Sequence, residues 1–427
     1  MKHTFYILLL LIMLPLQYLL AQAATPEQGY YLLKPDRVFD GEQMHENWQV
    51  LVHGHTIEAT GAALQAPAEA QIILLPGMTL LPGLIEGHSH LFLHPYNEVS
   101  WNDQVLKESR AERTARATVH ARNTLLAGFT TVRDLGTEGA GFDDVGLKQA
   151  ISKGVIPGPR MLVATKAIVA TGSYGPKPFS AELEAPVLGA ATADGYDALI
   201  KEVRTQIGKG ADIIKVYADY RWGANGEAEP TFTEEELKTI VAVANSSGRP
   251  VVAHAATAEG MRRAIMAGVA TVEHGDGGTP ALFKLMKQKG VAFCPTLAAG
   301  DAIAQYSGWQ KRIQPEPTHL QEKRQSFAEA LKAGVTICMG GDVGVFPHGD
   351  NAREMEMMVA YGMKPVQVLQ AATAVNARVF GLADKVGQIK PGLLADIIAV
   401  KGNPATTIEQ VRQVQFVMKD GTIYKQP

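Results

Sequence analysis

The chain has 427 residues, of which 46% are hydrophobic and 19% are charged, and its formal net charge is −3. This composition is ordinary for a globular protein and allows a large core with a second, smaller domain. The near-zero charge, without a long block of like charges, gives no reason to expect nucleic acid or an acidic membrane surface as a partner.

Residues 1–23 have the pattern of a signal peptide. An apolar run over residues 5–20 precedes Ala21-Gln22-Ala23, which fits an Ala-x-Ala cleavage site. A membrane anchor is the alternative, but the run is short for a membrane span and contains Pro15. We therefore expect cleavage after Ala23, a periplasmic or secreted mature protein, and no stable membrane anchor.

Residues 24–81 and 381–427 both have a pattern of short strands and turns. The expected strands cover residues 31–33, 49–52, 57–59 and 72–74 in the first segment, and 395–400, 414–418 and 422–424 in the second. Asp420-Gly421 between two apolar runs is a hairpin signal. We expect the two ends of the chain to form one composite β-sandwich beside the main domain.

Residues 82–380 alternate helical stretches with short apolar strands, which predicts an α/β fold. The expected strands cover residues 84–90, 130–132, 161–164, 212–216, 250–254, 270–274, 291–294 and 335–339. Eight right-handed βα units close into a (β/α)8 barrel of the TIM type. A doubly wound open sheet is the alternative, but no Gly-x-Gly-x-x-Gly motif follows the early strands.

The two cysteines, Cys294 and Cys338, are too few for a disulfide framework. Both lie in apolar, strand-like runs, so we expect buried free thiols. A bridge between them stays open at this point, because the sequence does not place their Cα atoms within reach of each other.

A pair of histidines closes the first strand of the predicted barrel. The apolar run from Leu80 ends in His88 and His90, and residues two apart on a strand point to the same side. Both imidazoles can therefore face one metal ion. The alternative is two surface histidines in a loop.

Other metal-binding side chains end later strands. Active sites of such barrels lie at the carboxyl ends of the strands. The groups found there are Lys215 on the fourth strand, His254 on the fifth, His274 on the sixth and Asp342 after the eighth. Their convergence with His88 and His90 predicts a metal site at this end of the barrel.

Lys215 needs a separate explanation, because an ammonium group would repel a metal ion. Burial favours the neutral amine, which can react with carbon dioxide to give an anionic carbamate with two oxygens. Such an N6-carboxylated lysine can bridge two cations. The alternative is a lysine that extends from the barrel mouth to solvent.

The chain resembles the amidohydrolase superfamily over nearly all of its mature length. The matching motifs are Pro82-Gly83-Leu84-Ile85-Glu86-Gly87-His88-Ser89-His90, Ile214-Lys215-Val216, Val252-Ala253-His254, Val272-Glu273-His274-Gly275 and Gly341-Asp342. Many members have Asp where this chain has Glu86, a difference to which we attach little weight because the residue only precedes the metal ligands.

The lysine motif makes the chain similar to the binuclear branch of that superfamily. One-metal deaminases and imidazolonepropionases resemble the chain elsewhere but lack this lysine. The resemblance is stronger to metal-dependent dipeptidases for Xaa-Pro or Xaa-Arg/Lys and to ochratoxin-hydrolysing amidohydrolases. The Thr171–Gly175 loop departs from the Gly-Gly-His loop of several prolidase-like members, which weakens a simple Xaa-Pro assignment.

The resemblance implies a ligand set and a mechanism. His88, His90 and Asp342 would hold one metal, His254 and His274 the other, and carboxylated Lys215 with a water or hydroxide would bridge them. Two Zn²⁺ ions suit these ligands, although another divalent metal is an alternative. Asp342 would be catalytic and move a proton from that water to the leaving nitrogen.

Loops after the strands carry candidate substrate-binding residues. We expect Tyr174, Tyr217 and Arg221 to bind a substrate carboxylate, since a guanidinium holds such a group at two points. Other candidates on these loops are His94, Tyr96, Trp101, Ser173, Lys177, Tyr220 and His348. The alternative for each aromatic is simple packing at the barrel mouth.

The predicted function is an exported binuclear-zinc amidohydrolase that forms homo-oligomers. Its substrate would be a small molecule, either a dipeptide or an N-acyl amino acid, with ochratoxin-type amides among the candidates. A lactone or phosphoester hydrolase on the same metal site is the alternative enzyme. A non-catalytic scaffold is a third hypothesis. The presence of all six expected metal ligands argues against it.

Overall fold

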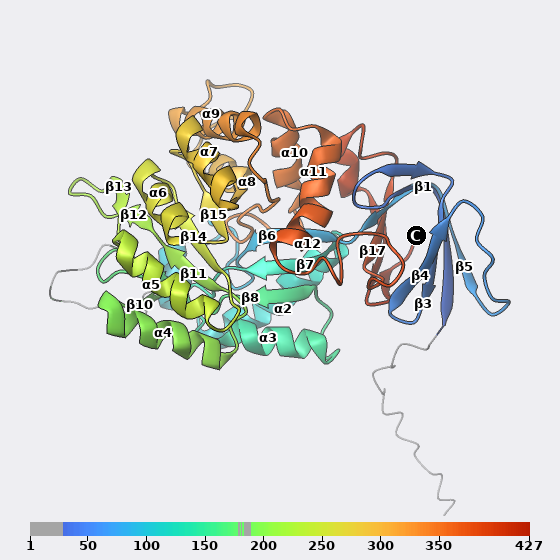
Figure 1. Ribbon diagram of the computed structural model, residues 1–427, viewed down its shortest axis with the longest axis horizontal. Coiled ribbons are helices and arrows are strands. Elements are labelled where there is room, and N and C mark those ends of the chain that lie inside the picture. The colour runs from blue at the N-terminus through green and yellow to red at the C-terminus, as the bar shows by residue number, and fades with distance from the viewer. Residues whose placement is uncertain (1–28, 178–179, 181, 183–188) are drawn as a thin grey trace, which may run out of the picture.

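The computed structural model describes residues 29–177, 180, 182 and 189–427. The predicted signal peptide lies outside the described residues. A sheet built from both ends of the chain, coloured blue and red, stands beside a larger region of parallel strands and helices (Figure 1). Within the described ranges, no helix has the length and apolar character needed to cross a membrane.

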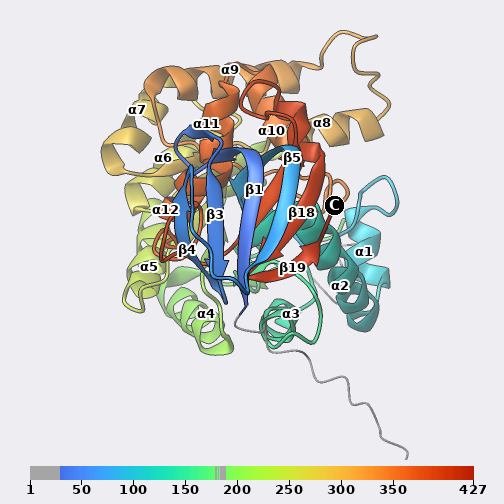
Figure 2. The same cartoon turned by 90° about the vertical axis from the view of Figure 1, so that its right-hand side faces the viewer.

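The terminal sheet has the strand order β19-β18-β17-β5-β1-β3-β4, with β2 paired to β1. Its strands are β1 (Tyr30–Phe39), β2 (Met44–Glu46), β3 (Gln49–His53), β4 (Thr56–Gly61), β5 (Gln71–Pro82), β17 (Ile397–Lys401), β18 (Val414–Lys419) and β19 (Thr422–Lys425). The two chain ends meet where β17 pairs antiparallel with β5, with Ile397 opposite Pro82. The predicted joining of the two ends is thus confirmed, and Figure 2 shows β3, β1 and β5 side by side, with β18 in the same sheet.

Strand β17 of the terminal sheet is covered on both faces. Ile397 and Ala399 belong to a cluster made within the sheet, which also holds Phe416. Ile398 and Val400 point the other way and belong to the main core. Successive residues of a strand face opposite sides, so a strand buried on both faces is a continuous apolar run.

The main domain contains two parallel sheets. Their strands are β6 (Leu84–Ser89), β7 (Phe129–Asp134), β8 (Arg160–Val163), β9 (Ile168–Val169), β10 (Ala191–Thr192), β11 (Ile214–Tyr217), β14 (Val251–Ala255), β15 (Thr271–His274) and β16 (Ala292–Cys294). One sheet has the order β6-β7-β8 and the other the order β10-β9-β11-β14-β15-β16. The predicted alternation of parallel strands and helices is therefore present.

The segment expected as the eighth strand, residues 335–339, is not a regular strand. It makes an isolated parallel bridge between Ile337 and Phe293, and Val343 makes another with Ser89. These bridges link β16 of one sheet to β6 of the other. A Cβ atom at Gly340 would lie 2.5 Å from Cys294 Sγ and 2.8 Å from the His88 backbone nitrogen, so the close approach of these segments requires glycine at this position.

Helices separate the strands. They are α1 (Trp101–Lys107), α2 (Arg110–Leu126), α3 (Asp143–Ser152), α4 (Gly195–Lys209), α5 (Glu234–Asn245), α6 (Ala258–Ala267), α7 (Pro280–Lys289), α8 (Leu297–Tyr306), α9 (Thr318–Ala333), α10 (Ala352–Ala360), α11 (Pro365–Gln370) and α12 (Asn376–Val379). Helix α5 begins with a capping box, in which the Thr233 hydroxyl accepts from the Glu236 N–H. Helix α4 ends at Gly210, whose positive φ of 107° suits a glycine C-cap.

A short hairpin that we did not expect lies between β11 and α5. Its strands are β12 (Asp219–Arg221) and β13 (Ala228–Pro230), paired antiparallel. The segment lacks an alternating apolar pattern, which is why periodicity did not reveal it.

Both cysteines are buried and free. The expectation of buried thiols is confirmed, and the alternative of a bridge between Cys294 and Cys338 is not realised in the structure.

Candidate active site

The six predicted metal ligands lie at the carboxyl ends of the parallel strands. His88 is on β6, His90 directly follows it, Lys215 is on β11, His254 is on β14, His274 ends β15, and Asp342 follows the bridged segment. The ring centroids of His88 and His274 are 5.1 Å apart, and those of His254 and His274 are 4.4 Å apart. The fold thus gathers imidazoles from three strands at one place.

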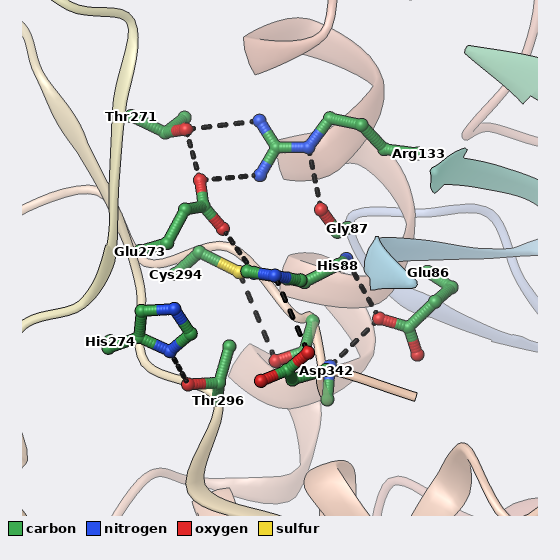
Figure 3. A network of polar contacts seen from close by, with 12 residues as sticks. Glu86, Gly87, His88, Arg133, Thr271, Glu273, His274, Cys294, Thr296 and Asp342 are labelled. Carbon is green, nitrogen blue, oxygen red and sulfur yellow. Dashed lines mark hydrogen bonds and ion pairs between the residues drawn. The ribbon is translucent and has the colours of Figure 1, made fainter. Parts of the chain in front are cut away.

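Asp342 lies close to both His88 and His90. Its Oδ1 is 3.3 Å from His90 Nε2 and 3.6 Å from His88 Nε2. Ligand atoms of His88, His274 and Asp342 lie within 4.8 Å of one another, a spacing that a divalent cation can fill (Figure 3). Burial alone would raise the pKa of Asp342, but the two histidines hold it well below its ordinary value.

Lys215 is fully buried on β11. Its Nζ has no hydrogen-bond partner among the described residues, and burial lowers the pKa of the amine. The alternative of a lysine that reaches solvent is therefore wrong. A buried amine with a lowered pKa and no carboxylate contact meets the chemical requirement for carbamate formation.

Each remaining imidazole has one ring nitrogen facing the protein. His90 Nδ1 is 2.9 Å from the Gly136 carbonyl oxygen, and His274 Nδ1 is 2.8 Å from Thr296 Oγ1. His254 turns Nε2 toward Asp219 Oδ1 at 3.7 Å. The opposite nitrogen of each ring is left for a metal, which is how protein contacts usually orient metal-bound histidines.

A buried acid that we did not predict holds His88. Glu273 Oε2 is 2.8 Å from His88 Nδ1, and Arg133 donates Nη2–H to Glu273 Oε1 at 2.7 Å (Figure 3). Arg133 also donates from Nε to the Gly87 carbonyl oxygen at 2.6 Å. Burial alone would raise the pKa of Glu273, but Arg133 and His88 hold it below the usual range. An acidic residue inside an otherwise apolar strand, next to His274, was the available signal.

Glu86 connects two ligand-bearing segments. Its Oε1 accepts the backbone N–H of His88 at 3.0 Å and of Gly341 at 2.8 Å, and its Oε2 accepts from Asn351 Nδ2 at 2.9 Å. Burial raises the pKa of Glu86 to about 7. We gave Glu86 little weight from the sequence, and the structure corrects this because the side chain positions both His88 and the segment of Asp342.

An aromatic wall lies beside the histidines. Tyr217 stacks on His254 with ring centroids 4.5 Å apart and an interplanar angle of 16°. Tyr174 lies 4.8 Å from Tyr217 and 5.2 Å from Trp101, also between ring centroids. Two of the three predicted carboxylate-binding residues thus lie next to the ligand set, in buried positions.

Arg221 is in a different environment. It is exposed on β12, opposite Ala228 of the hairpin, and it makes no ion pair within the part of the chain that the structure describes. Its neighbour Tyr220 contacts the wall, with its ring 4.8 Å from that of Tyr174. Arg221 is therefore exposed on a hairpin that adjoins the wall through Tyr220, a position called the rim below, and it is not among the buried groups.

Three other loop candidates bind the protein itself. His94 lies between Glu98 and Glu108, with nitrogen–oxygen distances of 3.0 and 2.7 Å. Ser173 Oγ donates to the Ala170 carbonyl oxygen, and His348 Nε2 is 3.0 Å from the Leu93 carbonyl oxygen. Through these contacts the three side chains position loops. This is a structural role, which is simpler than the substrate-binding role considered for them.

Comparison with known proteins agrees with this geometry. A model described as "Amidohydrolase family" matches residues 79–424. The ochratoxinase of Aspergillus niger is 31% identical over 383 residues, covering 82% of this chain and 76% of the relative. An imidazolonepropionase of Deinococcus radiodurans is 25% identical over 409 residues, covering 90% of this chain and 92% of the relative.

Solved structures give the same result. The crystal structure of a Xaa-Pro dipeptidase with bound methionine in the active site has a TM-score of 0.82 and 32% identity, covering 93% of this chain and 100% of that one. The A. niger ochratoxinase structure has a TM-score of 0.79 and 27% identity, covering 93% and 96%. The chain belongs to the amidohydrolase family, as its motifs predicted. It is a hydrolase that acts on carbon–nitrogen amide bonds.

Proposed function

We propose that this protein is a binuclear metallohydrolase that cleaves the amide bond of a dipeptide or of an N-acyl amino acid. The observation that carries the proposal is Lys215, a buried amine without a hydrogen-bond partner in the described structure, placed with four histidines and an aspartate at the strand ends. A site for one metal would not need a lysine there, whereas a bridging carbamate would.

The residues divide naturally between two cations. His88, His90 and Asp342 would hold one, and His254 and His274 the other, with carboxylated Lys215 shared between them. Imidazole and carboxylate ligands suit zinc. When bound, two such ions lower the pKa of a water and polarise a carbonyl oxygen.

Asp342 is the proton carrier in this proposal. Its Oδ1 lies close to His88 and His90, and its pKa is held low, so it is ionised at neutral pH and able to accept a proton. It would pass that proton to the leaving nitrogen. Glu273 and Arg133 keep the His88 ring in one orientation while this happens, which limits the reorganisation needed in the transition state.

The fold carries two further proposals. We infer that the parallel strands close through the bridges at Ile337 and Val343 into a (β/α)8 barrel, with the terminal sheet folded as a β-sandwich. Support comes from the amidohydrolase structures that superimpose on 93% of the chain. The predicted export and homo-oligomeric state are also retained as proposals.

The relatives support amide substrates that carry a free carboxylate. One similar structure is a Xaa-Pro dipeptidase with methionine bound in its active site, and a curated relative is an ochratoxinase. In this chain the substrate carboxylate would approach Arg221 at the rim, with Tyr217 beside His254. The Tyr174 hydroxyl already donates to Glu138 Oε2, so Tyr174 would shape the wall and not bind the carboxylate directly. Such a contact would align the amide carbonyl for attack.

The test combines metal analysis with a substrate panel. Purified protein should contain about two metal ions per chain, and it should hydrolyse dipeptides or N-acyl amino acids faster than lactones or organophosphates. Chelation should remove activity, and Zn²⁺ should restore it. A preparation that binds no metal would contradict the proposal, and a preference for lactones or phosphoesters would show that the amide assignment is wrong.

A further inference from the structure

Glu138 is a buried acid that the reaction described above does not use. It follows β7, has a positive φ of 48°, and is 3% exposed. Buried Arg113 holds its backbone by donating Nη1–H to the Glu138 carbonyl oxygen at 2.7 Å and Nη2–H to that of Thr137 at 3.0 Å. A non-glycine residue in this conformation is uncommon and costs free energy, so the loop is held in place by its surroundings.

Among the described residues, only one oxygen of the Glu138 carboxylate accepts hydrogen bonds. Oε2 accepts from the Tyr174 hydroxyl at 2.5 Å and from Trp101 Nε1 at 3.0 Å. Oε1 is buried and has no hydrogen-bond partner among the described residues. Because a buried carboxylate oxygen without a donor is costly, this atom is prepared to accept a hydrogen bond from a bound molecule.

Oε1 lies at the active site. A Cβ atom placed on Gly136 would lie 3.4 Å from Glu138 Oε1 and 3.8 Å from His90 Cε1, so both atoms border the same small space. Tyr174, which binds the other carboxylate oxygen, packs against Tyr217, and Tyr217 stacks on His254. The carboxylate therefore belongs to the wall beside the metal ligands.

We propose that Glu138 Oε1 binds the α-ammonium group of the substrate. The inference rests on the proposed amide hydrolysis and narrows its substrate class to dipeptides with a free amino terminus, in preference to N-acyl amino acids. An ammonium supplies both the missing donor and a compensating charge, which a neutral acyl chain cannot do. Rim-located Arg221 and wall-located Glu138 would then receive opposite ends of a zwitterionic dipeptide.

Three amide substrates test whether the α-ammonium group is the donor to Glu138 Oε1. L-leucyl-L-phenylalanine has an α-ammonium group, 4-methylpentanoyl-L-phenylalanine has hydrogen in its place, and 6-aminohexanoyl-L-phenylalanine has only a side-chain ammonium. We expect the metal-loaded wild type to hydrolyse the first with a kcat/KM roughly ten- to a hundredfold above the second. Glu138→Gln should remove most of this preference while changing the second substrate less than about threefold.

The matched control is Glu108→Gln. Glu108 is also largely buried and also has one unpaired oxygen, but it binds His94. This variant should keep the preference for the free amine. Equal loss on all three substrates in Glu138→Gln, or loss of bound metal, would overturn the proposal. A Glu138-dependent preference for 6-aminohexanoyl-L-phenylalanine would also overturn it, because the ammonium would then come from a side chain.

Calorimetric binding gives a readout that does not need turnover. L-leucine and 4-methylpentanoate differ only in the α-ammonium group, so wild type should bind L-leucine at least about tenfold more tightly and Glu138→Gln should bind the two alike. Equal affinity in the wild type would overturn the role of Glu138. If no amide is hydrolysed but the binding difference is present and depends on Glu138, the proposed function fails while the ammonium site stands.

Discussion

The histidine cluster, which is the proposed metal end of the site, and the exposed hairpin, which is the proposed substrate rim, are built in opposite ways. At the metal end, His88, His90 and His274 each make a second contact with a buried partner at 2.8–2.9 Å. At the rim, Arg221 stands on a short hairpin, exposed and without an ion pair among the residues described. The wall contacts both regions, because Tyr217 stacks on His254 and Tyr174 packs against Tyr220, the neighbour of Arg221.

This difference indicates how tolerant each region is to substitution. When a substitution removes the partner of a buried charged group, the remaining charge is uncompensated in a medium of low dielectric constant. The effect of such a substitution is therefore large. At an exposed position water replaces the partner and salt screens the charge, so the effect is small. Catalytic geometry should therefore depend most on the buried network, and substrate preference on the rim.

The largest effect is expected for Lys215→Ala. Removing the amine would remove the proposed bridging anion, so hydrolysis should be abolished, and short carboxylates such as acetate supplied with Zn²⁺ should restore part of it. Steady-state hydrolysis of a dipeptide, with and without the added acid, is the measurement. Lys419→Ala, which alters another buried lysine in the terminal sheet, is the control and should remain active. Full activity in Lys215→Ala would exclude the carbamate.

Asp342→Asn should reduce kcat by about 10²–10⁴-fold while the protein keeps at least one metal ion. Asparagine still offers an oxygen atom to a cation but cannot accept a proton. Measuring kcat and metal content on the same preparation separates metal binding from proton transfer by this residue. A decrease of less than tenfold would place the general base elsewhere.

Glu273→Gln should weaken metal binding about 10–100-fold. The amide would present an N–H group to His88 Nδ1, which favours the tautomer that carries its proton on Nε2, the nitrogen beside Asp342. Arg133 would also lose its anionic partner, and we expect the free energy of unfolding to fall by about 3–5 kcal/mol.

Competition with a chelator gives the metal affinity of Glu273→Gln, and denaturant unfolding gives its stability. Glu259→Gln is the matched surface control, because Glu259 pairs with Arg262 and Arg263 at positions that are partly exposed. That variant should change stability by less than about 1 kcal/mol. Equal effects of the two substitutions would contradict the contrast between the buried network and the surface.

Arg221→Ala should have the smallest effect, about a tenfold decrease in kcat/KM for a dipeptide with a free carboxylate. The same dipeptide with a C-terminal amide should be a poorer substrate of the wild type and should be little affected by the substitution. Arg262→Ala, which removes a partly exposed side chain of helix α6, controls for a general loss of positive charge. If the wild type hydrolyses the amide as well as the acid, carboxylate recognition is wrong. If the wild type prefers the free acid and Arg221→Ala keeps the same preference, another residue binds the carboxylate.

Several features of this protein were readable from local sequence. Alternating apolar strands and helices predicted the α/β class because side-chain periodicity is set by local backbone geometry. The positions of His88, His90, Lys215, His254 and His274 on or directly after strands predicted that these side chains gather at one face, because parallel strands bring their carboxyl ends together. Terminal strand patterns likewise indicated that the two chain ends join.

Tertiary structure alone decided which side chains support those ligands. Glu86 joins His88 to a segment more than 250 positions later, and Arg133 reaches Glu273 across 140 positions. Glu138 looks like an ordinary loop acid in the sequence, and its unpaired oxygen became apparent only through its burial beside Tyr174. Pairings between distant segments leave no periodic signal in the chain, because they depend on packing of the whole fold.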